Sequence, residues 1–155
     1  MTSTLTAATM TVTITESINL NGTNQGATNT LSLASIAEVS KRIVNVPASE
    51  VEVVAMSTAV AAGTFVESTV KYIRLTNLDD TNHITLTFKD EDATEVALLL
   101  DKGQSFIYNG DISAGVVNTM HAGGSALTVS LNDLVNITAL ADTAACDMEI
   151  FVAST

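Results

Sequence analysis

The chain has 155 residues, which is enough for one domain with its own core but not for two domains of ordinary size. Only 15% of the residues are charged, against about 25% in an average soluble domain, so much of the surface must carry hydroxyl and amide groups or lie against neighbouring chains. The net charge of -11 disfavours nucleic acid and anionic membrane surfaces as partners, since both are themselves negatively charged.

Neither a membrane span nor a secretory signal is expected. The uncharged stretch over 53–66 is shorter than the roughly 20 residues that a membrane-spanning helix needs. The N-terminal run MTSTLTAATM lacks the basic leader and the continuous apolar segment of a signal peptide. The single cysteine, Cys146, allows no internal disulfide, so the fold must be stable without one.

Alternating apolar and polar residues predict strands along most of the chain. Over 9–20, Met10, Val12 and Ile14 alternate with threonines, which predicts a strand with one apolar and one hydroxyl-lined face. Residues 21–26 are rich in Asn and Gly, which tolerate the positive φ of tight turns, and predict a turn or loop. Further strands are expected over 29–33, 41–46 (ended by Pro47) and 51–56, followed by a helical turn or a loop at 59–63.

The clearest prediction is a β-hairpin in the middle of the chain. The strands at 72–77 and 84–88 flank the polar run 79–82, which is typical of two paired strands and their loop. Turn signals continue at roughly ten-residue spacing without amphipathic helices, as in β-sandwiches and barrels. The remaining strands are expected over 95–100, 105–109, 126–131, 135–139 and 148–153.

The predicted fold class is therefore all-β: an antiparallel, jelly-roll-like β-sandwich with about nine or ten strands and little or no helix. We expect an N-terminal arm and first strand over 1–20, followed by a single sandwich domain over 21–155. No repeat of fixed period is visible, which argues against a solenoid or a propeller.

No constellation of catalytic residues is visible, and we predict that the protein is not an enzyme and uses no cofactor. His83 is expected at a strand edge, facing solvent or a backbone carbonyl, and His121 on the surface or in an interface. Cys146 is expected to be a small buried residue rather than a nucleophile.

Two acidic loops permit a calcium hypothesis, because Ca²⁺ prefers oxygen ligands. Neither loop has the spacing of an EF-hand, so we favour solvated loops and assign no metal ligand. Paired carboxylates also serve glycoside hydrolysis, but a chain with no Trp, two Tyr and four Phe offers few aromatic platforms for sugar. The acidic residues concerned are Asp79, Asp80, Asp90, Glu91, Asp92 and Glu95.

The distribution of charge is more informative than any motif. Glu16 is the single charged side chain in the first 37 residues, and the stretch 112–132 contains no Asp, Glu, Lys or Arg. An exposed, uncharged, strand-forming segment aggregates unless something covers it, so we expect both segments to lie against other chains. The alternative is a covered internal strand preceded by a frayed tail. The residues predicted to lie in interfaces are Thr4, Leu5, Met10, Val12, Ile14, Val116, Val117, Met120 and Leu127.

The run over 70–80, the strand at 84–88 and the segment 100–106, with its Gly103-Gln104-Ser105-Phe106, resemble the strand, turn and G-x-S-F run of small β-sandwich virion proteins of tailed bacteriophages. The composition is also similar to that of phage decoration (cement) proteins. This resemblance implies a homo-oligomer, expected to be a trimer, that sits on the capsid surface and stabilises the lattice of the major capsid protein. It supplies no catalytic residue. A phage tail or fibre component and a carbohydrate-binding β-sandwich module remain alternatives.

Overall fold

The structure is a computed structural model that describes residues 4–109 and 132–155. Within these ranges the chain is all-β, as predicted, with one short 3-10 helix, η1 (Glu67–Thr69). No helix in the described ranges has the length and hydrophobicity needed to cross a membrane. The thirteen described strands are β1 (Ala8–Thr15), β2 (Asn19–Leu20), β3 (Thr23–Asn24), β4 (Thr28–Ile36), β5 (Glu38–Val46), β6 (Val51–Ser57), β7 (Phe65–Val66), β8 (Val70–Asn77), β9 (Ile84–Asp90), β10 (Glu95–Leu100), β11 (Ser105–Asn109), β12 (Leu134–Ala141) and β13 (Cys146–Ser154).

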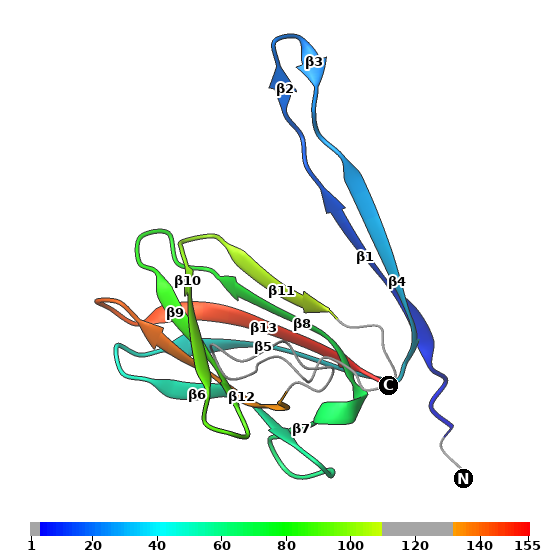
Figure 1. The fold of residues 1–155 in the computed structure, drawn as a ribbon, viewed down its shortest axis with the longest axis vertical. Helices are drawn as coiled ribbons and strands as arrows, with labels where there is room; N and C mark the ends of the chain where they lie inside the picture. Colours follow the sequence, from blue (N-terminus) through cyan, green and yellow to red (C-terminus); the bar gives the residue numbers. More distant parts are fainter. Residues whose placement is uncertain (1–3, 110–131) are drawn as a thin grey trace.

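The body of the molecule consists of two sheets that share one apolar core. The five-stranded sheet has the order β10-β9-β12-β6-β7, and the four-stranded sheet has the order β11-β8-β13-β5 (Figure 1). Alternate residues of each strand point inward, so Leu86 and Ile137 from one sheet join Leu75 and Ile150 from the other in a single buried cluster. The threonines and charged residues between them are left on the outer faces.

Strand pairing in the body is nested. The first strand of the body, β5, pairs with the last, β13, and β6 pairs with β12. Inside these pairs, β8 pairs with β11 and β9 with β10. The chain therefore forms one long antiparallel ribbon that folds over, and the pairs β8–β13 and β9–β12 close the two sheets.

The prediction that 72–77 and 84–88 pair as a β-hairpin is wrong. Both segments are strands, but β8 pairs only with β11 and β13 among the described strands, whereas β9 pairs with β10 and β12 in the other sheet. The polar loop between them crosses from one sheet to the other. Alternation reports which residues are buried and not which strand lies beside them, so the pattern of a hairpin and that of a sheet-to-sheet crossover are alike.

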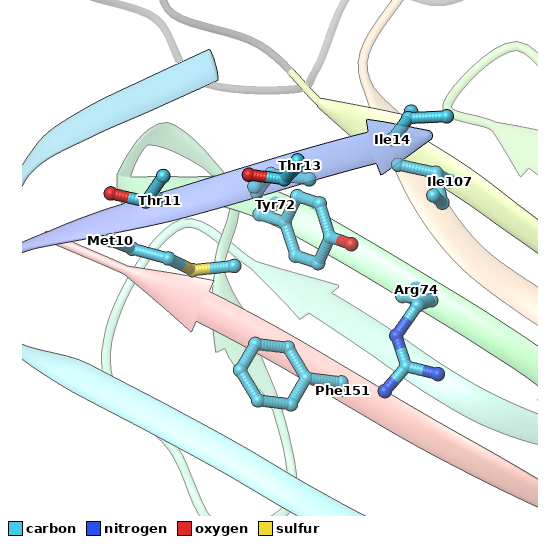
Figure 2. Close-up of a pocket in the computed structure, with 9 residues that line it drawn as sticks. Met10, Thr11, Thr13, Ile14, Tyr72, Arg74, Ile107 and Phe151 are labelled. Atoms are coloured by element: carbon cyan, nitrogen blue, oxygen red, sulfur yellow. The ribbon is translucent and has the colours of Figure 1, made fainter. Parts of the chain in front are cut away.

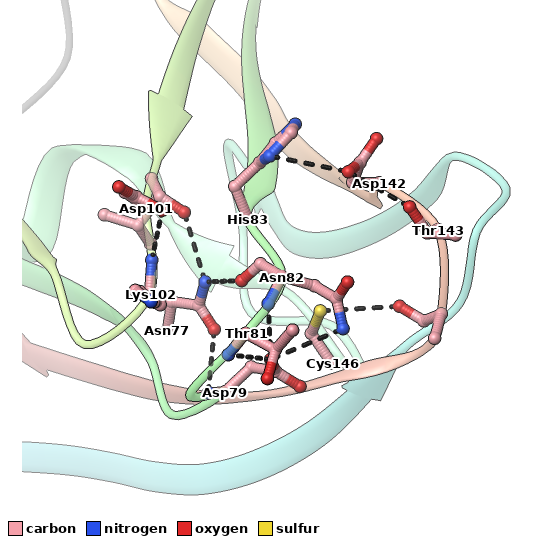
Figure 3. Close-up of polar contacts among 12 residues, drawn as sticks. Asn77, Asp79, Thr81, Asn82, His83, Asp101, Lys102, Asp142, Thr143 and Cys146 are labelled. Carbon is pink, nitrogen blue, oxygen red and sulfur yellow. Dashed lines mark hydrogen bonds and ion pairs between the residues drawn. The ribbon is translucent and has the colours of Figure 1, made fainter.

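Asn77, at the end of β8, fixes this crossover (Figure 3). Its side chain is fully buried, and its Nδ2 donates to the carbonyl oxygens of Asn82, at 2.9 Å, and Leu100, at 3.1 Å. Its Oδ1 accepts the backbone N–H of Asp79 at 2.9 Å. One side-chain amide thereby satisfies the hydrogen bonding of backbone groups in the crossover loop and at the end of β10.

The other predicted elements have mixed outcomes. The strand predicted over 9–20 is divided into β1 and β2, which residues 16–18 separate, and β3 lies within the loop predicted at 21–26. The other strands predicted within the described residues are present, and Pro47 follows β5 directly. The segment 59–63 is a loop, and the 3-10 turn comes after it. The predicted strand at 126–131 lies outside the described residues. Thirteen strands exceed the predicted nine or ten because the structure adds the two-residue strands β2, β3 and β7.

A β-hairpin arm precedes the body and projects well beyond it (Figure 1). It comprises residues 8–36: β1 pairs with β4 near the body, and β2 pairs with β3 at the tip. Asn21 and Gly22 make the turn with φ of 53° and 81°, as the positive-φ argument predicted. The boundary expected at residue 20 thus falls at the tip of this hairpin. At Gly26 a Cβ would lie only 2.2 Å from the carbonyl oxygen of Glu16, so the two chains of the arm meet there too closely for any side chain.

Replacing Asn77 by Ala should lower the free energy of unfolding by about 2–4 kcal/mol, because the buried carbonyl of Leu100 and the partly buried carbonyl of Asn82 and N–H of Asp79 lose their partner. Urea unfolding at pH 7 measures the loss. The control is Asn45→Ala, which removes an exposed hydrogen bond to Asp147 and should cost less than about 1 kcal/mol. Equal losses in the two variants would contradict the role given to Asn77.

Candidate interaction site

The root of the arm is anchored on the outer face of the four-stranded sheet. Leu33 and Ile36 of β4 are buried against Tyr72 of β8 and Ala153 of β13. Around this cluster pack five partly buried residues, Met10, Val12, Leu31, Ile107 and Phe151. The arm is therefore a second layer on this sheet near its root only, and it separates from the sheet farther along (Figure 1).

A β-bulge bends the arm at this root. Ala8 pairs with Ile36 and Met10 pairs with Leu33, so β4 contains one more residue than β1 between these two pairs. Ser35 lies in this interval with φ of 62°, a left-handed conformation that is unusual for a residue with a Cβ. Such a bulge increases local twist and redirects a strand, which accounts for the angle at which the arm leaves the body.

A groove of about 340 Å³ lies between β1 and the sheet beneath it (Figure 2). Its wall is formed by five consecutive residues of β1, 10–14. Because successive side chains of a strand point to opposite faces, a groove that contacts all five runs along the edge of the strand. β4 occupies the other edge of β1, and this wall is the edge that pairs with no described strand; we call it the free edge. The remaining lining residues are Tyr72, Arg74, Ile107 and Phe151.

A second groove, of about 230 Å³, lies between the arm and β11. It is lined by Val12 and Ile14 of β1, by three residues of β4, and by Ile107 and Asn109 of β11. Both grooves separate the arm from the sheet beneath it, so only the root of the arm packs tightly on the sheet. This geometry leaves the apolar underside of β1 accessible to another chain.

An ion-pair network neutralises the charge beside the groove. The Arg74 guanidinium lies 2.5 Å from a carboxylate oxygen of Glu149, and Lys41 Nζ lies 2.9 Å from the other oxygen. Arg74 also donates to Thr76 Oγ1 at 2.6 Å and lies 5.9 Å from the centre of the Phe151 ring. Hydrogen bonds from Lys41 and Arg74 lower the pKa of Glu149, so its carboxylate stays charged and paired.

Exposed apolar residues continue from the groove in two directions. On the outer part of the arm, Ile18 is 52% exposed and Leu20 is 58% exposed. On the sheet, Val39 and Ile43 of β5 are 54% and 59% exposed. Val39 pairs with Ala153, which lies under the arm, so both β5 residues share the outer face with the floor of the groove.

The structure places the predicted interface residues in different environments. Thr4 and Leu5 precede β1 and are exposed, with Leu5 at 73%. Met10 and Val12 pack partly against the sheet, whereas Ile14 is 45% exposed. Val116, Val117, Met120 and Leu127 lie outside the described residues, as does His121. Sequence reasoning missed the residues that receive the arm, above all Tyr72, Arg74 and Phe151, because they read as ordinary outward positions of strands.

His83 and Cys146, the remaining candidate residues from the sequence, each contact a neighbouring residue of the fold. His83 immediately precedes β9, and its Nδ1 lies 3.7 Å from the carboxylate of Asp142, which follows β12 (Figure 3). Cys146 is buried, as predicted, with its Sγ 3.4 Å from the carbonyl oxygen of Ala144. Burial raises the pKa of the thiol, which disfavours the nucleophilic thiolate.

The carboxylates of the acidic loops accept hydrogen bonds from their own turns. Asp79 Oδ1 accepts the backbone N–H groups of Asn82, at 2.6 Å, and Thr81, at 2.8 Å, and these bonds lower the pKa of Asp79. Asp90, which is buried, accepts the backbone N–H groups of Asp92 and Thr94. Across the part of the chain that the structure describes, no cluster of three or more His, Cys, Asp or Glu residues is placed to hold a metal ion.

No protein-family model matches the chain, and neither does any curated protein sequence. A function has therefore to be inferred from the residues and geometry of the chain itself. The features that stand out from an ordinary two-sheet domain are the projecting arm, the free edge of β1 and the neutral groove beside it.

Replacing Leu33 by Ala should release the root of the arm, because it removes the largest fully buried side chain of the root cluster. Amide hydrogen exchange should show protection of β1 and β4 falling by about 2–5 kcal/mol, with β8 and β13 nearly unchanged. Leu31→Ala, at a partly buried position of the same strand, is the matched control with a smaller effect. Equal loss of protection across the whole body would contradict a separately anchored arm.

Stability should depend on the ionisation of Glu149. Its pKa in the folded chain lies below the ordinary value of 4.5, so its ion pairs stabilise the fold above pH 4.5 and lose this effect as the pH falls through the folded-state pKa. Glu149→Gln should therefore be less stable than the wild type at pH 7, and the difference should shrink towards pH 3. Parallel stability curves for the two proteins over this range, measured by urea unfolding, would contradict the prediction.

Proposed function

We propose that the chain is a non-enzymatic structural subunit of a virion, a capsid decoration (cement) protein that binds the capsid lattice of a tailed bacteriophage as a homo-oligomer and stabilises it. The observation that carries this proposal is the arm. A two-stranded hairpin whose outer part exposes Ile18 and Leu20 has no second layer of its own. A segment of this kind is suited to bury those residues against another chain.

We further propose that the two-sheet body is a jelly-roll-like β-sandwich. The nested pairs β5–β13, β6–β12, β8–β11 and β9–β10 support this assignment, because a jelly roll is an eight-stranded antiparallel ribbon wound into two sheets. Jelly rolls occur in viral capsid proteins as well as in lectins, so the topology favours a shell protein by analogy of fold.

Lattice binding does not require strong individual contacts. Each copy contributes backbone pairing and apolar area, and a homo-oligomer presents several copies of its binding surface to a repeating lattice at once. Once the first contact has formed, the others bind at high effective concentration, and total affinity exceeds that of any single contact. An arm with Glu16 as its single charged residue pays little desolvation penalty when it is buried in this way.

The location on the particle separates the proposal from a tail or fibre component. A decoration protein covers the capsid and should be present in a large number of copies, whereas a tail component attaches at a unique vertex. Counting copies of the chain in purified virions by quantitative mass spectrometry distinguishes the two. Complete absence from virions would overturn both virion functions.

Shortening the arm should abolish particle binding and leave the body folded. Thr13 and Thr30 are cross-strand partners, so residues 14–29 can be replaced by Asn-Gly, the turn that the arm already uses. We expect an unchanged β-type circular dichroism spectrum and loss of the chain from reconstituted particles. The control is Leu99→Ser, at a 61% exposed position of β10, which should bind normally. Undiminished occupancy of the shortened variant would contradict a role for the arm.

A further inference from the structure

We propose that the groove along β1, together with the outer face of β13 and β5, receives the outer arm of a second copy of this chain. This inference rests on the proposed homo-oligomer and names the surface that forms it. We call this surface the arm-docking face; it comprises the free edge of β1 and the outward residues Phe151, Val39 and Ile43.

The wall of the arm-docking face is a strand edge. β1 pairs with β4 alone among the described strands, and none of these strands pairs with the N–H and C=O groups along its other edge. An extended segment that enters the groove can pair with this edge and add a third strand to the arm. Exposed strand edges with low charge are the typical sites of such pairing, and residues 8–15 contain no charged residue.

The floor provides apolar contact. Phe151 lies at the bottom of the groove, and the same sheet face continues past β13 to β5 (Figure 2). Val39 and Ile43 are each more than half exposed there, although both are large apolar residues. A strand seated beside β1 covers this exposed surface and forms a second layer over β5, which the chain's own arm does not supply.

The outer arm matches this face in length and hydrophobicity. Residues 16–21 span about 20 Å and the groove wall of five residues spans about 17 Å, at about 3.3 Å per residue. Ile18 and Leu20 offer the arm's exposed apolar side chains. In Figure 1 the outer arm points away from its own body, so its contacts are available to a neighbour.

Charge supports the same occupant. Glu16, the arm's one charged residue, is exposed, whereas the chain as a whole carries 17 acidic and 6 basic residues. Two of those basic residues, Lys41 and Arg74, lie on the outer face of the four-stranded sheet beside the groove. They share the single carboxylate of Glu149, so these three residues carry one more positive than negative charge, and the face accepts an arm with one negative charge.

The contact is heterologous, because the arm of one copy meets the face of the next. Repetition of such a contact closes into a ring when the rotation between copies allows it. A closed ring of three copies agrees with the trimer expected from the resemblance to decoration proteins. In a closed ring every arm and every docking face is used, so no uncharged strand edge remains to recruit further copies.

Cysteine pairs test the proposal directly. In a Cys146→Ala background, Ile18→Cys is placed in one preparation and Ile43→Cys in a second preparation that carries a mass tag. After mixing and mild oxidation, we expect the mixed disulfide dimer to form at least about tenfold faster than with Leu99→Cys as the partner of Ile18→Cys. All three positions are exposed, so the substitutions leave the core untouched. Equal rates for the two partners would overturn the proposal.

A charge exchange gives a second, independent measurement. Glu16→Lys and Lys41→Glu should each weaken self-association by about two- to fivefold, as expected for a pair at the rim of an interface, and the double variant should recover most of the loss. Analytical ultracentrifugation measures the association constants. Additive losses without recovery would overturn the proposed contact between Glu16 of one copy and Lys41 of the next.

The outcomes separate this inference from the proposed function. A homo-oligomer that binds particles but gives no Ile18–Ile43 disulfide overturns the docking face and leaves the decoration function standing. A specific disulfide in a chain that is absent from virions supports the docking face and overturns the decoration function. An arm whose cysteine cross-links only to the major capsid protein on particles shows that the lattice is the occupant, which also overturns the inference.

Discussion

The arm depends on one apolar contact, the packing of Leu33 and Ile36 against Tyr72 and Ala153. An isolated two-stranded hairpin is at best marginally stable in water, because it has no second layer on which to bury side chains. The root cluster supplies that layer for β1 and β4, and the Asn21-Gly22 turn keeps the outer strands in register. Beyond the root, apolar side chains stay exposed, and the arm gains its remaining stability only when another surface covers them.

The ion pairs of Glu149 neutralise charge beside the groove in addition to stabilising the fold. Lys41 and Arg74 share this partly buried carboxylate on one sheet, and the stabilisation is modest. Their effect is local: the side of the molecule next to the groove is nearly neutral, while the surplus of acidic residues lies elsewhere. A neutral, partly apolar face beside a strand edge favours the proposed association between copies, and the acidic remainder of the surface favours solubility of the resulting assembly.

The sequence predicted where strands occur better than it predicted how they pair. Alternation is a local consequence of burial on one face, so the strands around 72–77 and 84–88 were located correctly. Their predicted pairing was wrong, because a short polar loop can form either a hairpin turn or a crossover between sheets. The deciding group, buried Asn77, hydrogen-bonds to Leu100, a distant residue. The uncharged arm was noticed for its composition, but its docking residues Tyr72 and Phe151 are ordinary in sequence and become special only when the arm lies above them.

The position of the groove follows from the topology of the body. β5 is the first strand of the nested ribbon and pairs with the last, β13, so a hairpin that enters β5 directly emerges beside the C-terminal strand. Ala37, between the arm and β5, donates its N–H to the carbonyl oxygen of Ser154 and fixes this junction. The root of the arm packs over β13 and β8, and Val39 and Ile43 of β5, the edge strand of this sheet, remain exposed. Because every copy has the same exposed arm and the same uncovered strand, one chain supplies both of the different surfaces that the proposed contact between copies needs.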